Sequence, residues 1–403
     1  MNFSIELLEY KCATQQSLIE LLTLVTQLYF RKNKRVALCY HDLLNMFLLS
    51  QNLLTFTSLK FLTKVPIDRD CGIMKAIIPV AGAGTKLRPH TYTQPKALIP
   101  LAGRTVLSII VDQLCEAGIK EFIFIVGYLG DKIQDYIRHK YPQLTAHFVH
   151  QTDRQGIGHA IRLTRSIVNS EEAFVVLGDT ICEYDVHEVI NSPHSMLGVK
   201  KVDDPRDFGV AEIDEEGFIE HVVEKPHIPK SNMALVGIYK VKESDQMFQC
   251  LENNIRQGLR SHGEYSLTDA LDCMIKAGAK FKSFKVENWF DCGKKETLLE
   301  SNATMLKKFG SKIEEGLHFE NTVIIQPVSI AAGCNVKNSI IGPNVAVGEN
   351  TTIDYSIVKN SIIGSYSNLF DIVLDASLIG SDTEIKGETR TLNIGDNTDI
   401  DLG

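Results

Sequence analysis

The feature that most constrains the fold is a short-period repeat in the last part of the chain, from about Leu317 to Gly403. The segment Val-Lys-Asn-Ser-Ile-Ile-Gly at 336–342 recurs unchanged at 358–364. Aliphatic residues recur every five or six positions, with Gly, Asn, Asp and Ser between them: Ile330, Val336, Ile341, Val347, Ile353, Val358, Ile363 and Leu369. Hexapeptide periodicity is typical of a parallel β-helix, whose short strands stack aliphatic side chains inward. We therefore predict a short left-handed parallel β-helix over 317–403, in preference to an irregular β-sandwich.

A different pattern occupies residues 74–309, where short apolar runs alternate with amphipathic helical stretches. This alternation predicts an α/β fold, a doubly wound, mostly parallel, Rossmann-like sheet with helices on both faces. The expected strands are 75–80, 121–126, 144–149 and 173–177, and the expected helices are 106–117, 131–140 and 159–168. Later runs are expected as antiparallel additions that form a second wall of the pocket, at 196–202, 210–213, 219–223 and 233–241. Ligands bind such sheets at the carboxyl ends of the strands, which directs attention to the residues after Val80, Val149 and Leu177.

Residues 1–73 show neither domain pattern nor a motif with chemical meaning, although helical stretches are compatible with their composition. Met74 opens the first expected strand directly. We expect Met74 to be the true start and the upstream part to be an extension of doubtful status. The whole chain is 44% hydrophobic and 23% charged, as in globular proteins, and its length predicts two or three domains. The two patterns reduce this to two, 74–309 and 317–403.

The cysteine and charge patterns bear on the compartment and on partners. Nine cysteines occur without a C-x-x-C pair, which indicates a reducing compartment. Glu6 and Glu9 stand where a secretory signal carries basic residues, and the apolar runs are shorter than the roughly 20 residues of a membrane helix. A cytoplasmic protein without membrane association is expected. The net charge of -8, with no basic block near aromatic residues, argues against nucleic acid as a partner.

The first candidate site is the Gly-rich turn Ala81-Gly82-Ala83-Gly84-Thr85, which follows the first expected strand. Glycines without a Cβ let the backbone approach a phosphate and point N–H groups at its oxygens. The turn lacks both the P-loop pattern and the full Gly-x-Gly-x-x-Gly of dinucleotide folds, and alone it is equally compatible with an ordinary strand-to-helix turn. Three cations follow closely, Lys86, Arg88 and Lys96. Together they indicate a polyphosphate ligand.

A set of ordered motifs extends this site through the domain. After 81–89 and 93–100 come Gln151 with 156–160, 177–179, 207–209, 224–226 with 229–232, 263–269 and 289–293. In this order and spacing they resemble the signature of the sugar-1-phosphate nucleotidyltransferases, and most of all glucose-1-phosphate thymidylyltransferase. The resemblance implies the nucleotide-diphospho-sugar transferase fold. It also implies transfer of a nucleotidyl group from an NTP, with dTTP favoured, to a sugar 1-phosphate, with release of pyrophosphate.

The chemistry of that reaction suits the residues. The phosphate of a sugar 1-phosphate is already a nucleophile, so positioning and charge neutralisation are sufficient. By resemblance Asp179 and Asp291 are the ligands of Mg²⁺, which takes its other ligands from phosphate and water. Taken singly, Asp179 would more simply be a helix N-cap and Asp291 a turn residue.

The resemblance assigns the remaining roles residue by residue. Lys96 would hold the triphosphate and Lys225 the sugar phosphate. Glu224 would bind sugar hydroxyls with the backbone of Gly209 over the ring, while Gln151, Gly156 and the 81–84 turn would seat the base. Gln151 could equally cap a turn. Lys86 stands where the family usually has arginine. Lysine keeps the positive charge but loses the bidentate fork of a guanidinium group.

Alternatives remain open at this point. UTP with glucose 1-phosphate, GTP with mannose 1-phosphate, and a non-catalytic regulatory subunit of the same fold are all compatible with the motifs. Related enzymes carry a β-helical acyltransferase that needs a histidine among its coils, and here the repeat segment holds only His318, at its start. The β-helix is therefore interpreted as an oligomerisation or regulatory tail, and a homo-oligomer is expected.

Overall fold

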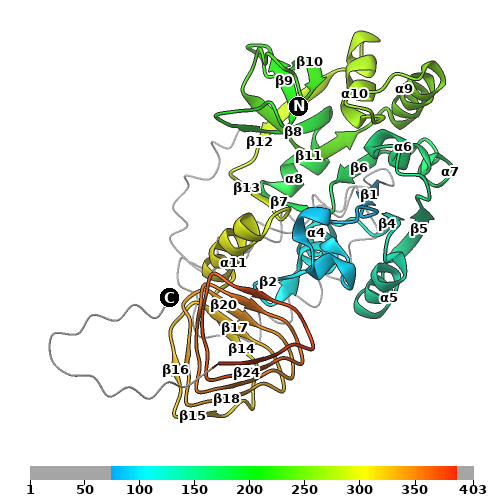
Figure 1. Ribbon diagram of the computed structural model, residues 1–403. Helices are drawn as coiled ribbons and strands as arrows, with labels where there is room; N and C mark the ends of the chain where they lie inside the picture. The colour runs from blue at the N-terminus through cyan, green and yellow to red at the C-terminus, as the bar shows by residue number, and fades with distance from the viewer. Residues whose placement is uncertain (1–73, 388–403) are drawn as a thin grey trace, which may run out of the picture. The chain divides into compact units, whose positions relative to one another are not determined.

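The computed structural model describes residues 74–387, all within one compact unit, Asp70–Gly403. Predictions about 1–73, including the start at Met74, and about 388–403 lie outside the described residues. The described chain first forms an α/β sheet layer and then a coil of short strands (Figure 1).

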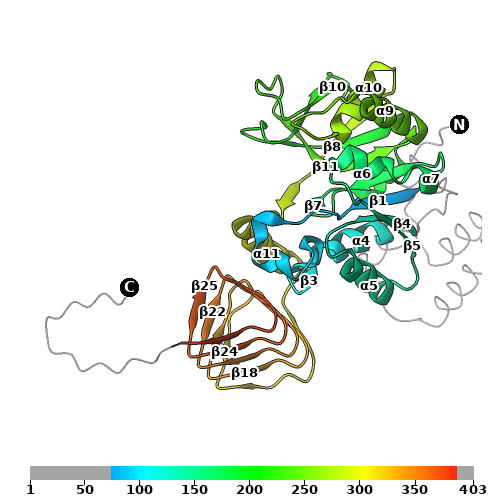
Figure 2. The same ribbon diagram turned by 45° about the vertical axis from the view of Figure 1, so that its right-hand side comes forward.

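A nine-stranded mixed sheet is the core of the α/β part (Figures 1 and 2). Its parallel centre consists of β1 (Lys75–Pro79), β4 (Glu121–Val126), β5 (Thr145–His150) and β6 (Ala173–Val176). β11 (Met233–Val241) runs antiparallel to β6, to β8 (Ser195–Lys201) and to β9 (Gly209–Ile213). β10 (Ile219–Glu224) pairs antiparallel with β9, and β12 (Phe281–Lys285) runs parallel to β8. The predicted α/β class is confirmed, and the later runs join the same sheet as antiparallel strands.

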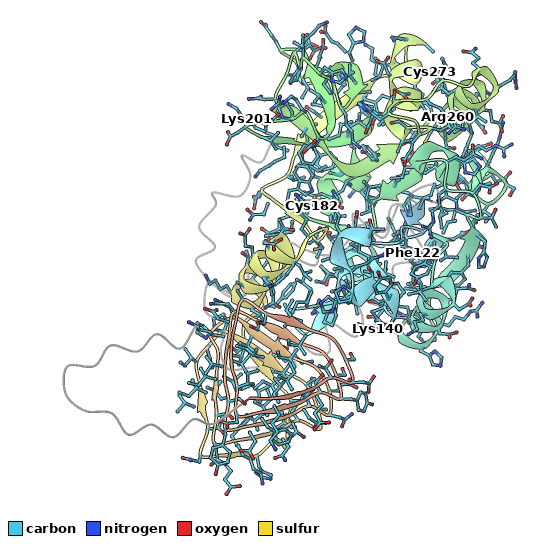
Figure 3. The ribbon with its side chains drawn as sticks, viewed as in Figure 1. Phe122, Lys140, Cys182, Lys201, Arg260 and Cys273 are labelled. Atoms are coloured by element: carbon cyan, nitrogen blue, oxygen red, sulfur yellow. A yellow bond between two sulfur atoms is a disulfide. The ribbon has the colours of Figure 1, made fainter. Side chains whose placement is uncertain are left out.

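Helices cover both faces of this sheet because its central strands are apolar on both sides. Along β4, Phe122 and Phe124 belong to one buried cluster, whereas Ile123 and Ile125 belong to the other (Phe122 is labelled in Figure 3). The helices are α4 (Val106–Glu116), α5 (Gly130–Lys140), α6 (Ile157–Arg162), α7 (Arg165–Val168), α8 (Val186–Asn191), α9 (Ser244–Gln257), α10 (Leu267–Lys276) and α11 (Lys295–Phe309). Within 74–387, no helix is long and apolar enough to cross a membrane.

One expected helix, 159–168, is divided into α6 and α7. The division falls at Thr164, whose Oγ1 donates a 2.7 Å hydrogen bond to the carbonyl of Ile161. A threonine hydroxyl bonded to a nearby carbonyl competes with the helical ladder, which the apolar spacing alone did not reveal.

The coil confirms the predicted parallel β-helix, and its stacked strands are consistent with the left-handed type. Its three parallel sheets are β14-β17-β20-β23-β26, β15-β18-β21-β24-β27 and β16-β19-β22-β25. Their strands are Lys312–Ile313, Phe319–Glu320, Val323–Ile324, Val328–Ile330, Asn335–Lys337, Ile340–Ile341, Val345–Val347, Thr352–Asp354, Ile357–Lys359, Ile362–Ile363, Asn368–Phe370, Val373–Asp375, Leu378–Ile379 and Glu384–Lys386, for β14 to β27 in order. Val336 pairs with Ile353, and Ile353 with Leu369, so successive coils advance by 353 − 336 = 17 and 369 − 353 = 16 residues.

Each copy of the repeated heptapeptide forms a corner of the coil, and the two copies lie at different corners. The segment 336–342 runs from β18 into β19, whereas 358–364 runs from β22 into β23, on the next pair of sides. In both copies the asparagine occupies the corner in the left-handed region, with φ of 47° at Asn338 and 48° at Asn360. Asparagine tolerates this conformation better than most residues.

The cysteines differ from the expectation drawn from their spacing. Cys250 of α9 and Cys273 of α10 form a disulfide, with their Cα atoms 6.0 Å apart (Cys273 is labelled in Figure 3). The packing of α9 against α10 brings the two thiols together. Neither an odd cysteine count nor the absence of C-x-x-C excludes a pair that the tertiary fold creates.

Candidate active site

The Gly-rich turn after β1 is fixed at one glycine and open at the other. Ala81 is buried, whereas Gly82 is exposed, and a Cβ there would meet nothing within 4 Å. Gly84 has a φ of 60°, and its carbonyl accepts a 2.8 Å hydrogen bond from Thr91 Oγ1. A Cβ at Gly84 would lie 2.8 Å from Thr91 Cγ2. The turn therefore has a held backbone with an accessible Gly82, as contact with phosphate oxygens requires.

The residues that follow the turn are anchored by one apolar side chain. Thr85 and Lys86 are exposed and Ala83 is half-buried. They lead through a short 3-10 turn, Thr85–Leu87, to the buried Leu87. The Lys86 side chain is thus free to reach a ligand above the turn, but the geometry gives it no defined partner among the described residues.

Lys96 and Asp179 meet at the carboxyl ends of β1 and β6. Lys96 Nζ donates a 2.6 Å hydrogen bond to Asp179 Oδ2, and the two side chains are 18% and 42% exposed. Gly178, just before Asp179, donates its N–H to the carbonyl of Pro79 at 3.3 Å. A side chain at Gly178 would overlap Val80, so glycine allows the two strand ends to approach this closely.

Asp291 is brought to the same place by its backbone. It ends β13 (Asn288–Asp291), which pairs antiparallel with β7 (Thr180–Glu183), so that Asp291 lies opposite Thr180. Cys292 N–H donates to the carbonyl of Asp179 at 3.3 Å. The backbone of Asp291, at the end of β13, therefore lies beside that of Asp179, in the turn just before β7.

This arrangement fits Mg²⁺. The ion prefers carboxylate oxygens and usually keeps positions for phosphate and water. Among the described side chains, no group of three or more His, Cys, Asp or Glu could hold a metal ion by itself. A site with few protein carboxylates leaves positions on such an ion for substrate phosphates and water.

Gln151 and Gly156 form a second group after β5. Gln151 is 8% exposed, and its Nε2 donates to the carbonyl of Gly156 at 3.2 Å and lies 3.4 Å from His159 Nδ1. Burial, together with the positive charge of Arg162, lowers the pKa of His159. The ring is therefore neutral near pH 7 and can accept the amide proton. The same bonds leave Gln151 Oε1 as the amide atom suited to a ligand donor.

Glu224 and Lys225 form the third group, at the end of β10. Glu224 Oε2 accepts hydrogen bonds from Thr268 Oγ1 at 2.5 Å and from Ser266 Oγ at 3.2 Å. Gly209 pairs with Glu224 across the strands, and a Cβ there would lie 3.1 Å from Thr268 Oγ1. Glycine at 209 thus leaves room for this carboxylate and its donors.

Lys225 has an unusual backbone for a non-glycine residue, with a φ of 43°. Its N–H donates to the carbonyl of Phe208 at 3.0 Å, and its own carbonyl lies 3.2 Å from His262 Nε2. Such conformations cost on the order of 1–3 kcal/mol and are concentrated at functional sites. The Lys225 side chain is 47% exposed, with Nζ 3.9 Å from Glu224 Oε1.

One contact between aromatic rings and two backbone hydrogen bonds connect these groups. The rings of Phe208 and Trp289 lie 4.8 Å apart, which joins the segment before Gly209 to the strand that ends at Asp291. Tyr265 N–H donates to the carbonyl of Gln155, and Gly158 N–H donates to the carbonyl of Tyr265, both at 2.8 Å. The second pair joins the group at Gln151 to the start of α10, which holds Glu224.

Sequence reasoning missed the residues that hold the site rather than face a ligand. Thr268, Ser266 and His159 lie in motifs that were noted, but they were given no role, and Thr91 was not considered. Ser, Thr and His are common polar residues, so only their contacts distinguish these four from others.

A surface hollow of about 700 Å³ lies elsewhere, lined only by residues of 203–233, among them Glu212 and Lys230.

Comparison with known proteins identifies the family. Residues 75–308 match the profile of the nucleotidyl transferase family. The chain belongs to this family. The match covers the sheet, the signature turn and all the motifs noted above, and the activity it supports is that of a sugar-1-phosphate nucleotidyltransferase.

Relatives of this nucleotidyltransferase carry several names. Low-salt glycan biosynthesis nucleotidyltransferase Agl11 of Haloferax volcanii is 31% identical over 82% of this chain and 100% of its own length. Glucose-1-phosphate thymidylyltransferase of Streptomyces antibioticus is 28% identical over 82% of this chain and 99% of its own. Bifunctional protein GlmU of Methanocaldococcus jannaschii is 33% identical over 80% of this chain and 81% of its own length. A crystal structure of UDP-glucose pyrophosphorylase complexed with UDP-glucose is 27% identical, with a TM-score of 0.51 over 59% of this chain and 99% of its own.

Proposed function

We propose that this nucleotidyltransferase transfers a thymidylyl group from dTTP to glucose 1-phosphate, giving dTDP-glucose and pyrophosphate. The observation that carries the proposal is the convergence of the open Gly82 turn, Lys96 and Asp179 at one end of the sheet. The relative from Streptomyces antibioticus is named for this reaction.

Each group then has a role in binding and orientation. Gly82 and its neighbours contact the phosphates of dTTP, and Lys96 balances the charge that builds up during transfer. Asp179 and Asp291 would hold Mg²⁺, which would supply further neutralisation of phosphate charge. Gln151 Oε1 accepts the N3–H of the base, since its amide nitrogen is already engaged by Gly156.

The sugar 1-phosphate occupies the third group. Lys225 pairs with its phosphate, while Glu224 accepts hydrogen bonds from sugar hydroxyls through Oε1, the oxygen not engaged by Thr268. Gly209 keeps this surface open. Lys86 adds an exposed cation beside the nucleotide phosphates. No general base is required, because the sugar phosphate is itself the nucleophile.

UTP is the second candidate, because uracil presents the same N3–H to Gln151 and because a structural neighbour is a UDP-glucose pyrophosphorylase. The test is a matrix of dTTP, UTP, GTP, CTP and ATP against glucose, mannose and N-acetylglucosamine 1-phosphates, with pyrophosphate release measured. We expect the highest kcat/KM with dTTP and glucose 1-phosphate. A higher value with UTP would overturn the choice of base, and silence with every pair would overturn catalysis.

A homo-oligomer in the cytoplasm is also part of the proposal. One outward face of the β-helix carries an apolar row in register across its coils, with Val323, Ile357 and Val373 exposed and Ile340 half-buried. Val323 and Val373 are 55% and 68% exposed, which supports contact with a second copy. Light scattering of the full chain measures the assembly, and a monomer at all concentrations would exclude it.

A further inference from the structure

The outward faces of the β-helix differ in what covers them. On the face of β17, β20, β23 and β26, which we call the covered face, four outward residues lie in register: Ser329, Ala346, Ile362 and Leu378. The first three are 4%, 3% and 0% exposed. On the face of β16, β19, β22 and β25, by contrast, Val373 is 68% exposed. The covered face is therefore packed against other parts of the chain.

The covered face completes the buried core of the α/β part. Ile362 belongs to the same buried cluster as Leu98, Ile99 and Leu101, whereas its neighbour Ile363 belongs to the interior cluster of the coil. Those three residues lie two, three and five positions after Lys96. The β-helix thus shares one buried core with the segment that carries the proposed catalytic lysine.

That segment ends in a hairpin of β2 (Pro100–Leu101) and β3 (Arg104–Thr105), whose turn contacts the covered face. Ala102 and Gly103 at the turn have φ of 50° and 74°, both in the left-handed region. A Cβ at Gly103 would overlap Ser329 Oγ, so glycine allows the turn to approach the coil this closely.

One fully buried amide fixes the turn to the coil. Asn302 of α11 is 0% exposed. Its Oδ1 accepts the N–H of Ala102 at 2.9 Å, and its Nδ2 donates to the carbonyl of Asn344 at 3.1 Å. Asn344 lies directly before β20 of the covered face. Both functional ends of the Asn302 side chain are therefore used to join the hairpin to the β-helix.

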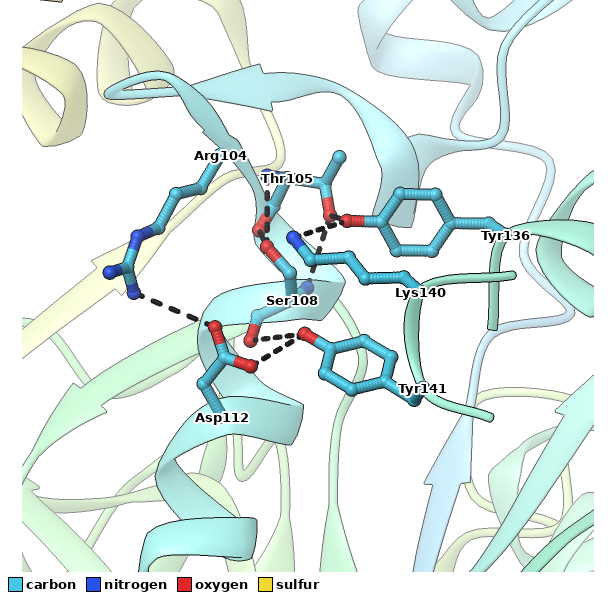
Figure 4. A network of polar contacts seen from close by, with 7 residues as sticks. All are labelled: Arg104, Thr105, Ser108, Asp112, Tyr136, Lys140 and Tyr141. Carbon is cyan, nitrogen blue, oxygen red and sulfur yellow. Dashed lines mark hydrogen bonds and ion pairs between the residues drawn. The ribbon is translucent and has the colours of Figure 1, made fainter. Parts of the chain in front are cut away.

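The other end of the hairpin is held separately (Figure 4). Thr105 Oγ1 accepts the N–H of Ser108 at 3.1 Å and donates to Tyr136 Oη at 2.9 Å. Tyr141 donates to Asp112 at 2.6 Å. Burial, with the negative charge of Asp112, raises the pKa of Tyr141, so its hydroxyl stays a donor. Because Thr105 is fixed in this way, the position of the turn at Ala102 and Gly103 sets the position of the residues that precede the hairpin.

We propose that Asn302 is a positioning residue, which holds Lys96 in place by locking hairpin β2–β3 to the β-helix. The inference rests on the proposed role of Lys96. Residues 97–99 are buried between Lys96 and the hairpin, and Gln94 Nε2 donates to the carbonyl of Leu98 at 3.3 Å, so the connection has little freedom. The β-helix then supports catalysis within its own chain, beyond any role in assembly.

The test compares Asn302→Ala in two backgrounds, the full-length wild type and Lys96→Ala, with kcat measured by pyrophosphate release at saturating substrates. Misplacement of a catalytic group by about 1 Å can cost up to about 10²-fold, so we expect kcat to fall about tenfold or more in the wild-type background. In the Lys96→Ala background, the same substitution should change kcat less than twofold. The KM of glucose 1-phosphate should be unchanged in both backgrounds.

Asn254→Ala is the matched control, because Asn254 is a buried asparagine of α9, on the other side of the sheet. It should lower the melting temperature and leave kcat unchanged. Gly103→Ala disturbs the same turn from the coil side and serves if Asn302→Ala fails to fold; it should show the same dependence on Lys96.

Two results would overturn the inference while leaving the proposed function intact. One is an equal fold-loss of kcat in both backgrounds, and the other is a lower melting temperature with unchanged kcat. If Lys96→Ala alone keeps the wild-type kcat, the proposed role of Lys96 fails and the inference fails with it. Because that last result involves no change at Asn302, the two failures are distinguishable.

Discussion

The β-helix and the mixed sheet are built on opposite principles. In the β-helix, Val336, Ile353 and Leu369 occupy equivalent positions in successive coils, and each fills the same kind of interior site. In the sheet, Lys96, Gln151 and Glu224 each have surroundings that occur once. A repeat therefore specifies an interior, whereas a catalytic site depends on contacts between segments distant in sequence.

The largest expected effect concerns the site of the sheet, where each residue has surroundings that occur only once. Asp179→Asn removes a negative charge that pairs with Lys96 at 2.6 Å and that we expect to bind Mg²⁺. Loss of one such electrostatic contact typically costs about 10²–10³-fold in kcat. We expect a fall of at least about 10²-fold at saturating substrates and Mg²⁺, and EDTA should abolish wild-type turnover.

Asp185→Asn is the control for that substitution. Asp185 is an exposed residue that caps α8 through Glu188 N–H, and asparagine caps helices equally well. Its kcat should equal that of the wild type. If Asp179→Asn behaves like this control, the proposed metal site is wrong.

Sequence reasoning succeeded where a local pattern has one structural solution. The strands at 121–126 and 233–241 were located to the residue, because apolar runs between turn signals leave little choice. The site residues Lys96, Asp179 and Gly209 came from motifs, and their assigned roles stay predictions. Thr268 and Asn302 could not be found in this way, since a hydroxyl or an amide acquires its role only from a partner on another element.

For the β-helix, the limit of prediction was the outer surface. The period gave the inward residues and the parallel strands, but Ile362 and Val373 are both outward aliphatic residues in the same pattern. Ile362 is fully buried against the α/β part, and Val373 is 68% exposed. The sequence period does not show which face of the β-helix another element covers, because that depends on tertiary packing.

Stability measurements on these two residues give the next largest effect. Ile362→Ala leaves a cavity in the shared core and should lower the free energy of unfolding by about 2–5 kcal/mol. In the monomer, Val373→Ala should change it by less than about 0.5 kcal/mol, as surface substitutions usually do. Urea unfolding of the full chain, followed by fluorescence, measures both. Equal losses at a concentration where light scattering shows a monomer would contradict the difference between the two faces, whereas a loss at Val373 only in the assembled protein would reflect the proposed contact with a second copy.

The smallest expected effect tests one singular contact of the sheet site, the 2.5 Å hydrogen bond from Thr268 to Glu224 Oε2. Thr268→Val keeps the shape of the buried side chain and removes the donor, so Glu224 keeps only the 3.2 Å bond from Ser266 and turns more freely. A hydrogen bond to a charged group contributes about 1.5–3 kcal/mol. We expect the KM of glucose 1-phosphate to rise about tenfold, equivalent to about 1.4 kcal/mol. The KM of dTTP should stay unchanged, because Gln151 and the Gly82 turn lie on other elements.

Thr268→Ser, which restores the hydroxyl, should recover most of the affinity. An equal rise in the KM of both substrates would mean that Thr268 supports the whole site rather than the sugar group alone.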